Sequence, residues 1–291
     1  MTDVRRTVVP TRVGPVPVRA FGPPGGAPVV IAVHGALVDG RVWDGMAGRL
    51  AARATVLLPD LPLGAHRTAV PDRSRLNPVD LAGAIVDVLD AFGAEAPVVV
   101  GNDSGGALTQ VAVASHPGRF GGLVLTSCDA FEHFPPPALR SFPWLVRVPG
   151  GTRAVARLFT VPALFGRPGP LNLLSARGLG RELVRSMLEP VLTDDGVRDD
   201  LTAFARLMDN KHTLRAAERL TTWTKPTVIA WSRRDRIFPP ADGERLAATL
   251  PNAELVWIDD ALTFSMLDQP ESVAAAVRTV LVRVQAGATQ T

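Results

Sequence analysis

The chain alternates short apolar runs with longer segments in which apolar residues recur at helical spacing. The short runs are rich in β-branched residues and cover residues 28–33, 55–58, 98–100, 120–126, 226–231 and 254–258. Runs of this length and composition are typical of strands buried in a sheet. Helical spacing is clearest in 77–92, where Leu81, Ile85 and Val88 share one face and Pro78 suits a first turn. The alternation predicts an α/β fold.

The strand pattern stops between residues 134 and 220. Helical segments such as 181–192 and 197–208 replace it. We therefore expect a core of residues 1–133 and 221–291 and an inserted helical cap of residues 134–220. The larger apolar side chains of the cap are expected to fill its interior, with some lining a pocket; they are Phe142, Trp144, Leu145, Phe159, Phe165 and Phe204.

The start of the chain alternates apolar and polar residues over 7–12 and 16–21, with Gly14 and Pro15 between them. This pattern predicts a β-hairpin at the edge of the sheet. The segment carries several arginines and no apolar run, unlike a secretory signal, and no stretch approaches the length of a membrane span. We therefore expect a cytoplasmic protein without a membrane partner.

Composition narrows the function classes further. The 291 residues are 46% hydrophobic and 20% charged, as in ordinary globular proteins, and the net charge is only +3. Because the arginines are scattered, we expect no nucleic-acid partner. Cys128 is the one cysteine, which excludes an internal disulfide. There is no Cys/His cluster and no G-x-G-x-x-G after the first strand, so we expect no metal and no cofactor.

The run 98–100 leads into the most informative motif, Gly101-Asn102-Asp103-Ser104-Gly105-Gly106, and then into a helix over 107–114. A strand that turns this abruptly into a helix forces the central residue into a strained conformation and requires small neighbours. The side chain of Asp103 therefore projects from the end of the sheet at a helix N-terminus, where backbone N–H groups favour negative charge.

This motif resembles the G-x-S-x-G nucleophile elbow of the α/β-hydrolase superfamily, with Asp103 in the nucleophile position. The resemblance implies an α/β-hydrolase fold, in which helices flank a mostly parallel central sheet and a helical cap is inserted. An Asp here resembles the haloalkane dehalogenase, haloacetate dehalogenase and epoxide hydrolase branch, whose carboxylate attacks carbon to form an ester. We reject the register in which Ser104 is the nucleophile, because Asn102 would then have to serve as the first glycine. One alternative stays open, in which Asp103 only caps the helix.

The turn His34-Gly35-Ala36 follows the run 28–33 and resembles the superfamily turn that supplies an oxyanion-hole N–H. By that resemblance the N–H of Ala36 is functional and His34 is structural, while Leu37 and Trp43 lie beside the site.

Two differences set the chain apart from the nearest activities of the branch. Dehalogenases place halide donors directly after the nucleophile and near this turn, where the chain has Ser104, Ala36 and Leu37. Epoxide hydrolases of the branch rely on cap tyrosines, and this chain has no Tyr. The resemblance therefore does not select either activity.

The resemblance implies a catalytic acid and a catalytic histidine. The acid is Asp235, in the loop 232–239, or Asp129, after the run 120–126, and Asp235 matches better by position. The histidine is missing, because the alignment of Phe264 and Gln269-Pro270 puts Thr263 in its place. A Thr hydroxyl cannot act as a general base near neutral pH.

The substitutes for the missing base come from the histidines of loops and cap. His34 is tied to its turn, and His116 is expected to point away from the site. Our order of preference among the others is His66, then His133, then His212. Each of these could equally be a surface or packing residue.

We therefore expect an enzyme that acts on a small, largely apolar molecule, using Asp103 and a backbone oxyanion hole. One alternative is a non-hydrolytic isomerase, lyase or cyclase, with Asp103 as general acid or base and no oxygen taken from water. The other is an inactive ligand-binding protein, whose affinity would not depend on Asp103. The expected partner is a small-molecule substrate, and a homodimer stays open.

Overall fold

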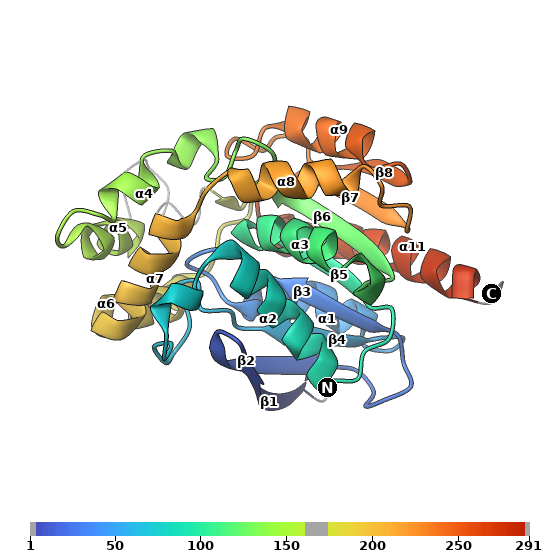
Figure 1. The fold of residues 1–291 in the computed structure, drawn as a ribbon, viewed down its shortest axis with the longest axis horizontal. Helices are drawn as coiled ribbons and strands as arrows, with labels where there is room; N and C mark the ends of the chain where they lie inside the picture. Colours follow the sequence, from blue (N-terminus) through green and yellow to red (C-terminus); the bar gives the residue numbers. More distant parts are fainter. Residues whose placement is uncertain (1–3, 161–173, 289–291) are drawn as a thin grey trace.

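The computed structural model describes residues 4–160 and 174–288, which fold around one eight-stranded sheet (Figure 1). The strands follow the spatial order β1-β2-β4-β3-β5-β6-β7-β8. Their bounds are β1 Val4–Thr11, β2 Gly14–Phe21, β3 Val29–Val33, β4 Thr55–Pro59, β5 Val98–Asp103, β6 Gly122–Cys128, β7 Thr227–Ser232 and β8 Ala253–Ile258.

The sheet is mostly parallel, as the resemblance implied. The six apolar runs of the sequence form β3 to β8, and all of their neighbouring pairs are parallel. β1 and β2 form the predicted antiparallel hairpin, and β2 joins the sheet by pairing antiparallel with β4. Side chains of β3, β4, β5 and β6 are buried on both faces, because helices cover both sides of the sheet.

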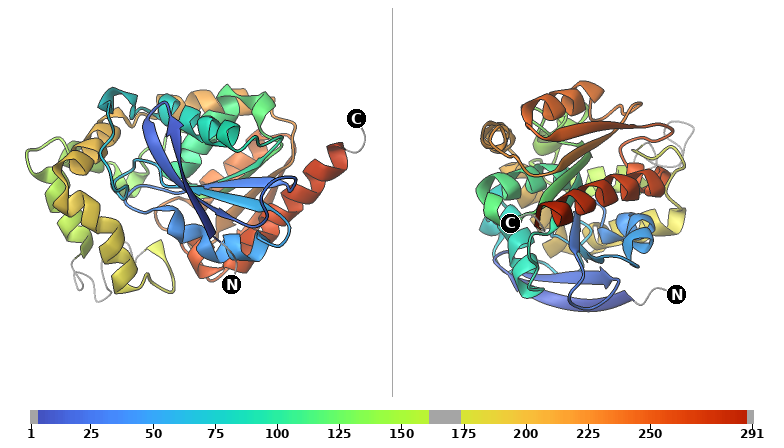
Figure 2. Two further views of the ribbon diagram at one scale, coloured as in Figure 1. Left: turned by 90° about the horizontal axis from the view of Figure 1, so that it is seen from below. Right: turned by 90° about the vertical axis from the view of Figure 1, so that its right-hand side faces the viewer.

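Helices lie on the two faces of this sheet (Figures 1 and 2). α2, α3 and α8 pack together on one face, and α1 and α11 pack together on the other. α9 packs against β7 and β8. The bounds are α1 Asp44–Leu50, α2 Pro78–Ala91, α3 Ser104–Ser115, α8 Lys211–Leu220, α9 Pro240–Thr249 and α11 Pro270–Ala288. The short helices are η1 Gly40–Trp43, η2 Arg73–Arg75, η3 Pro117–Arg119, η4 Pro137–Leu139 and α10 Ser265–Asp268.

Four more helices form the end of the molecule farthest from the C-terminus of α11 (Figure 1). They are α4 Phe142–Leu145, α5 Gly151–Thr160, α6 Arg181–Thr193 and α7 Asp195–Leu207. These helices occupy most of the segment expected to form the cap, whereas α8, at the end of that segment, lies along α3 on the sheet. Phe165, expected among the cap's apolar side chains, lies outside the described residues.

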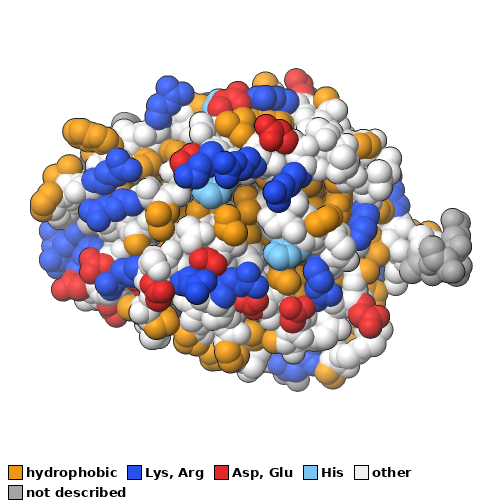
Figure 3. Space-filling view, viewed as in Figure 1, with side chains coloured by type: hydrophobic (Ala, Val, Ile, Leu, Met, Phe, Trp, Pro, Cys, Tyr) orange, Lys and Arg blue, Asp and Glu red, His pale blue; other side chains and the backbone are white. Residues whose placement is uncertain are grey.

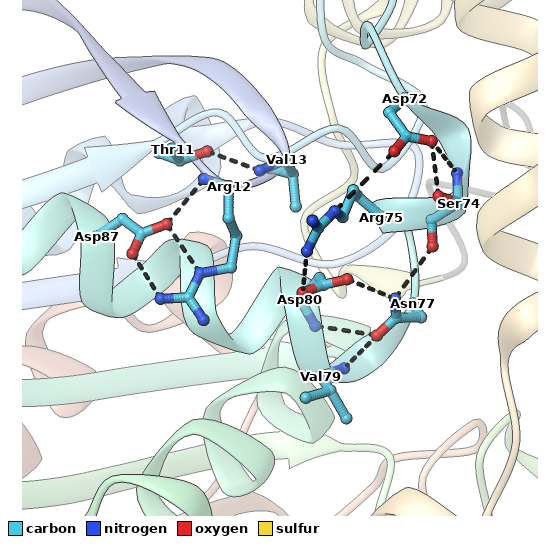
Figure 4. A network of polar contacts seen from close by, with 10 residues as sticks. All are labelled: Thr11, Arg12, Val13, Asp72, Ser74, Arg75, Asn77, Val79, Asp80 and Asp87. Atoms are coloured by element: carbon cyan, nitrogen blue, oxygen red, sulfur yellow. Dashed lines mark hydrogen bonds and ion pairs between the residues drawn. The ribbon is translucent and has the colours of Figure 1, made fainter.

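Polar contacts hold α2 and the first hairpin together (Figure 4). The side chain of Asn77 accepts hydrogen bonds from the N–H groups of Val79 and Asp80 at 3.1 and 3.0 Å, which caps the first turn of α2. Farther along the same helix, the carboxylate of Asp87 binds the guanidinium of Arg12 at 2.7 Å, and Arg12 lies just after β1. The hairpin is thereby tied to the helix as well as to the sheet.

The start of α3 packs unusually close to the neighbouring backbone. A methyl group added to Gly105 would lie 2.3 Å from the carbonyl oxygen of His34 and 2.5 Å from that of Val33. A methyl group on Gly106 would lie 2.2 Å from the Cβ of Cys128. The two glycines that follow Asp103 therefore allow α3 to sit directly on the ends of β3 and β6.

We expect Gly105→Ala to lower the free energy of unfolding by about 1–3 kcal/mol, because backbone must move to admit the methyl group. The matched control is Gly48→Ala, since Gly48 is an exposed residue of α1 with no atom near an added methyl group. This control should stabilise the protein by up to about 1 kcal/mol through helix propensity. Urea unfolding measures both, and equal stability of the Gly105→Ala variant and the native protein would contradict the close packing.

Candidate active site

The predicted elbow is present at the junction of β5 and α3. Asp103 is the last residue of β5, and α3 begins at Ser104. The backbone of Asp103 has φ 54° and ψ −138°, a conformation that non-glycine residues rarely adopt. The turn therefore holds Asp103 in a strained position at the carboxyl end of the sheet.

The carboxyl group of Asp103 is fixed by its neighbours. Its Oδ1 accepts hydrogen bonds from the backbone N–H of Ser104 at 2.5 Å and from the Ser104 hydroxyl at 3.0 Å. Its Oδ2 faces the opposite turn, since a methyl group on Gly35 would lie 2.7 Å from this oxygen. Burial raises the pKa of Asp103 to about 6, although the bonds from Ser104 act in the opposite direction.

The turn after β3 lies beside this carboxyl group. The backbone N–H of Leu37 donates to the carbonyl of Leu63 at 2.9 Å, and Leu37 has a φ of 62°. Among the backbone hydrogen bonds of the described residues, none has the Ala36 N–H as donor. Ala36 and Asp103 line the same cavity. Ala36 and Ser104 both line the cavity with Asp103, so their backbone N–H groups are candidate donors to a negative charge that develops there.

His34 and Trp43 have structural surroundings. The Nε2 of His34 accepts a hydrogen bond from the N–H of Leu61 at 2.9 Å, so its Nδ1–H donates to the carbonyl of Gly35 at 2.8 Å. Burial lowers the pKa of His34, which keeps the ring neutral. The ring of Trp43 is fully buried in the core. Neither side chain is part of the cavity wall as the structure describes it.

Thr263 contacts the acid loop, in the position where the resemblance implies a histidine. Its hydroxyl donates to Oδ1 of Asp235 at 3.1 Å, and the same oxygen accepts from the N–H groups of Ile237 and Phe238 at 2.8 and 2.9 Å. The carbonyl of Thr263 accepts from Nδ2 of Asn102 at 2.8 Å. Burial raises the pKa of Asp235. Asp235 thus has a hydrogen-bonded partner at this position, but the partner cannot accept a proton near neutral pH.

Asp129 lies next to the elbow, after β6. Its backbone N–H donates to the carbonyl of Asp103 at 3.4 Å, and its side chain is fully buried. Neither carboxyl oxygen has a hydrogen-bond partner among the described residues. Burial, followed by the charge of Asp103, holds the pKa of Asp129 well above its usual range.

The structure brings none of the three substitute histidines to the cavity wall that it describes. His66 accepts from the N–H of Gly64 at 3.2 Å through Nδ1, and its Nε2 lies 3.2 Å from Oδ2 of Asp200 in α7. His133 binds Asp242 of α9 at 2.7 Å through Nδ1.

His212 belongs to α8 and lies in a surface groove between α8 and α3. All three substitutes thus have positions in which they support packing or contact solvent, away from Asp103.

A cavity of about 410 Å³ lies between the elbow and the segment that contains α4 and α5. Asp103 and Ser104 form part of its wall, together with Ala36 and Leu37 from the turn after β3. Most of the other described lining side chains are apolar and come from the cap; they include Leu139, Phe142, Leu145, Val155, Leu158, Phe159, Leu174 and Met208. Asp103 is the one ionisable side chain in the described lining.

The described residues contain no group of three or more His, Cys, Asp or Glu side chains arranged to hold a metal ion. Within the same part of the chain, no helix is both long and apolar enough to cross a membrane.

Comparison with known proteins identifies the family. A family model described as alpha/beta hydrolase fold matches residues 28–270 of the chain. The chain belongs to the α/β-hydrolase fold family. The match spans the turn after β3, the elbow, the acid loop and Thr263, so the α/β-hydrolase expected from these motifs is confirmed.

This α/β hydrolase has relatives of moderate similarity. It is 25% identical over 264 residues to an uncharacterized protein of Mycobacterium tuberculosis, which covers 87% of this chain and 74% of the relative. It is 26% identical over 240 residues to the 2-hydroxy-6-oxononadienedioate/2-hydroxy-6-oxononatrienedioate hydrolase 2 of Pseudomonas putida, with 79% of each chain covered.

A similar solved structure is that of the haloalkane dehalogenase DbeA from Bradyrhizobium elkani. The TM-score is 0.80 at 19% identity, and the match covers 98% of this chain and 100% of that one. At this identity the likeness shows the fold alone.

Three polar residues that contact the predicted site residues are not evident from the sequence. Asn102 holds Thr263, while Asp200 and Asp242 hold His66 and His133. Asp200 had a detectable signal, because it lies on the same helical face as the apolar residues of α7 and is fully buried. A charge on an apolar helix face requires a partner, but the sequence does not say which one.

We expect the raised pKa of Asp103 to make the free energy of unfolding depend on pH. The folded state binds the Asp103 proton more tightly than the unfolded state does, so ionisation of this carboxyl group lowers the free energy of unfolding as the pH rises from about 4 through about 6. Asp103→Asn removes the charge. Its free energy of unfolding, relative to that of the native protein, should therefore be about 1–2 kcal/mol higher, which means a more stable fold, near pH 8 than near pH 4.5.

Urea unfolding at the two pH values measures this difference. Asp259→Asn is the matched control, because Asp259 is an exposed carboxylate that pairs with Arg233, and its effect should be small at both pH values. A pH-independent effect of Asp103→Asn would show that the Asp103 carboxyl group is not desolvated.

Proposed function

We propose that this α/β hydrolase acts on a small, largely apolar molecule that binds in the cavity, and that Asp103 is the residue that reacts with it. One observation carries the proposal: Asp103 is the single ionisable side chain in the described cavity wall, and a strained turn fixes it there. In this proposal residues 134–220 act as the cap over Asp103.

The substrate class follows from the cavity. A volume of about 410 Å³ lies within the range of small-molecule sites. The described wall contains no Lys, Arg or His to neutralise an anion. The name of the Pseudomonas putida relative describes dianionic substrates, and such a molecule would lose its hydration here without gaining a counter-charge. We therefore favour an uncharged substrate.

In the first step, Oδ2 of Asp103 attacks an electrophilic carbon, and the leaving group departs with its bonding electrons. The product is an ester of Asp103. Oδ1 becomes the ester carbonyl oxygen and stays bonded to the N–H of Ser104. If water then attacks this ester, the charge on Oδ1 develops beside the N–H of Ser104, with that of Ala36 on the neighbouring turn.

The second step needs a base to take a proton from water. Thr263 occupies the usual position of that base, and the described cavity wall has no histidine. Loss of a general base costs on the order of 10²–10⁴ in rate. The ester of Asp103 is therefore long-lived in this proposal.

A second function is favoured by the same lack of a base together with the pKa of Asp103. A carboxyl group with a pKa of about 6 can both accept and donate a proton near neutral pH. Asp103 would then act as general acid and base in an isomerisation, elimination or cyclisation. The name of the Pseudomonas putida relative favours hydrolysis, so we place this function second.

We expect a covalent ester on Asp103 when the protein is incubated with alkyl halides or epoxides. The intact mass should increase by the alkyl group of the halide, which leaves as halide ion, or by the whole epoxide, and peptide mapping should locate the group on Asp103. Since only the carboxylate attacks, the rate of adduct formation should fall as the pH drops through about 6.

Asp103→Asn should form no adduct, whereas the Asp259→Asn control should react like the native protein. For any compound that turns over, the reaction in ¹⁸O-labelled water distinguishes the two functions. The ester route places ¹⁸O in the Asp103 carboxyl group, and the acid–base route does not. Turnover that survives Asp103→Ala would contradict both.

We expect Thr263→His to restore the missing base, because the new imidazole would stand beside Asp235. The adduct should then hydrolyse, and steady-state turnover should rise by about 100-fold or more. Thr263→Gln controls for side-chain size and should leave the adduct stable. Thermal unfolding of both variants checks the fold, and an adduct that persists in a folded Thr263→His variant would contradict this role for the position.

A further inference from the structure

Exposed apolar side chains gather on the cap. Ten large hydrophobic residues are exposed in the described chain, and five of them fall between residues 139 and 158. They are Leu139, Trp144, Leu145, Val148 and Leu158. Trp144 is the most exposed of all ten, at 71%. An exposed tryptophan among leucines and valines is unusual for a surface that contacts only water.

The same part of the sequence carries only positive charge. Between residues 134 and 180 there are six arginines and no Lys, Asp or Glu. The net charge of this segment exceeds the +3 of the whole chain. Arg140, Arg147 and Arg153 are exposed and form no ion pair with any described residue. In Figure 3, orange and blue side chains cover the end of the molecule where Figure 1 places α4 and α5, and the red ones lie lower, toward α6 and α7.

This surface is continuous with the cavity. Leu139, Leu145 and Leu158 are exposed to solvent and also line the cavity that contains Asp103. The apolar wall of the site and the apolar surface of the cap therefore share these three side chains. A largely apolar molecule could pass along them without entering water.

We propose that the α4–α5 surface of the cap, comprising the exposed side chains of residues 139–158, binds the surface of an anionic lipid bilayer. Trp144 and Val148 enter the interface between headgroups and acyl chains, and Arg140, Arg147 and Arg153 contact the anionic headgroups. The cavity then opens toward the bilayer and takes its substrate from the lipid, a consequence that rests on the proposed function.

Charge favours a bilayer over a second copy of the chain. A symmetric dimer through this surface would bring the arginines of two copies together without a single acidic residue between 134 and 180 to pair with them. Anionic lipid supplies the complementary charge, because its surface attracts basic residues that lie near it. The association is peripheral and needs no spanning helix. It would revise the expectation, drawn from the sequence, that the chain has no membrane partner.

The test is sedimentation with vesicles of phosphatidylcholine alone or with roughly 30% phosphatidylglycerol. We expect the protein to bind the anionic vesicles, to bind neutral vesicles weakly, and to dissociate as salt is added. The charge-reversal variant Arg140→Glu/Arg147→Glu/Arg153→Glu should lose more than about 10-fold in affinity. Trp144→Ser/Val148→Ser should also bind more weakly, and should lose the blue shift of tryptophan emission that lipid causes in the native protein.

The matched control is Arg206→Glu/Arg215→Glu/Arg219→Glu, which makes the same change in net charge on exposed positions of α7 and α8. This control should bind anionic vesicles like the native protein, and so should Asp103→Asn. Failure to bind anionic vesicles at low salt would overturn the proposal, as would an equal loss in the control. So would a dimer that forms without lipid and dissociates in the cap variants.

The failure of this proposal can be told apart from that of the proposed function. The charge-reversal variant changes no residue of the described cavity wall, so its adduct formation with soluble compounds should be unchanged.

Discussion

The close contact of three backbone segments at the elbow determines the geometry of the whole site. β5 ends at Asp103, α3 starts at once, and the turn after β3 lies so near that residues 35, 101, 105 and 106 have no room for a side chain. This contact forces the positive φ of Asp103 and directs its carboxyl group toward Gly35. The backbone donors of the site come from the same segments, so the strain of the turn and the position of the N–H groups have one cause.

Burial without a cation gives the site its electrostatic character. Asp103, Asp129 and Asp235 lie at the ends of β5, β6 and β7, and their carboxyl groups are desolvated rather than paired with a positive charge. Their pKa values therefore rise. Beside Asp235, Thr263 contributes only a hydroxyl group. The site can hold and transfer protons through carboxyl groups, but it offers no base of ordinary strength beside Asp103.

The segment with α4 and α5 combines two properties that a lid over an aqueous active site does not need. Its side chains make much of the cavity wall apolar, and Leu139, Leu145 and Leu158 of that wall are also exposed to solvent, near several arginines. Both properties suit a substrate that dissolves better in lipid than in water. The core residue Asp103 would then determine the chemistry, and the cap would determine where the substrate is found.

The sequence by itself determined the strands, the hairpin and the elbow, because each depends on residues that are neighbours in the chain. It also placed Asp103 at the elbow and Thr263 after the last strand. Only the tertiary structure decided the roles of the polar side chains. His66 resembled a base by its place in a loop, yet it pairs with Asp200, which lies 134 positions away. Asn102 holds Thr263 across 161 positions. Such pairs depend on how helices and loops pack around the sheet. A local pattern of hydrophobic and polar residues does not predict that packing.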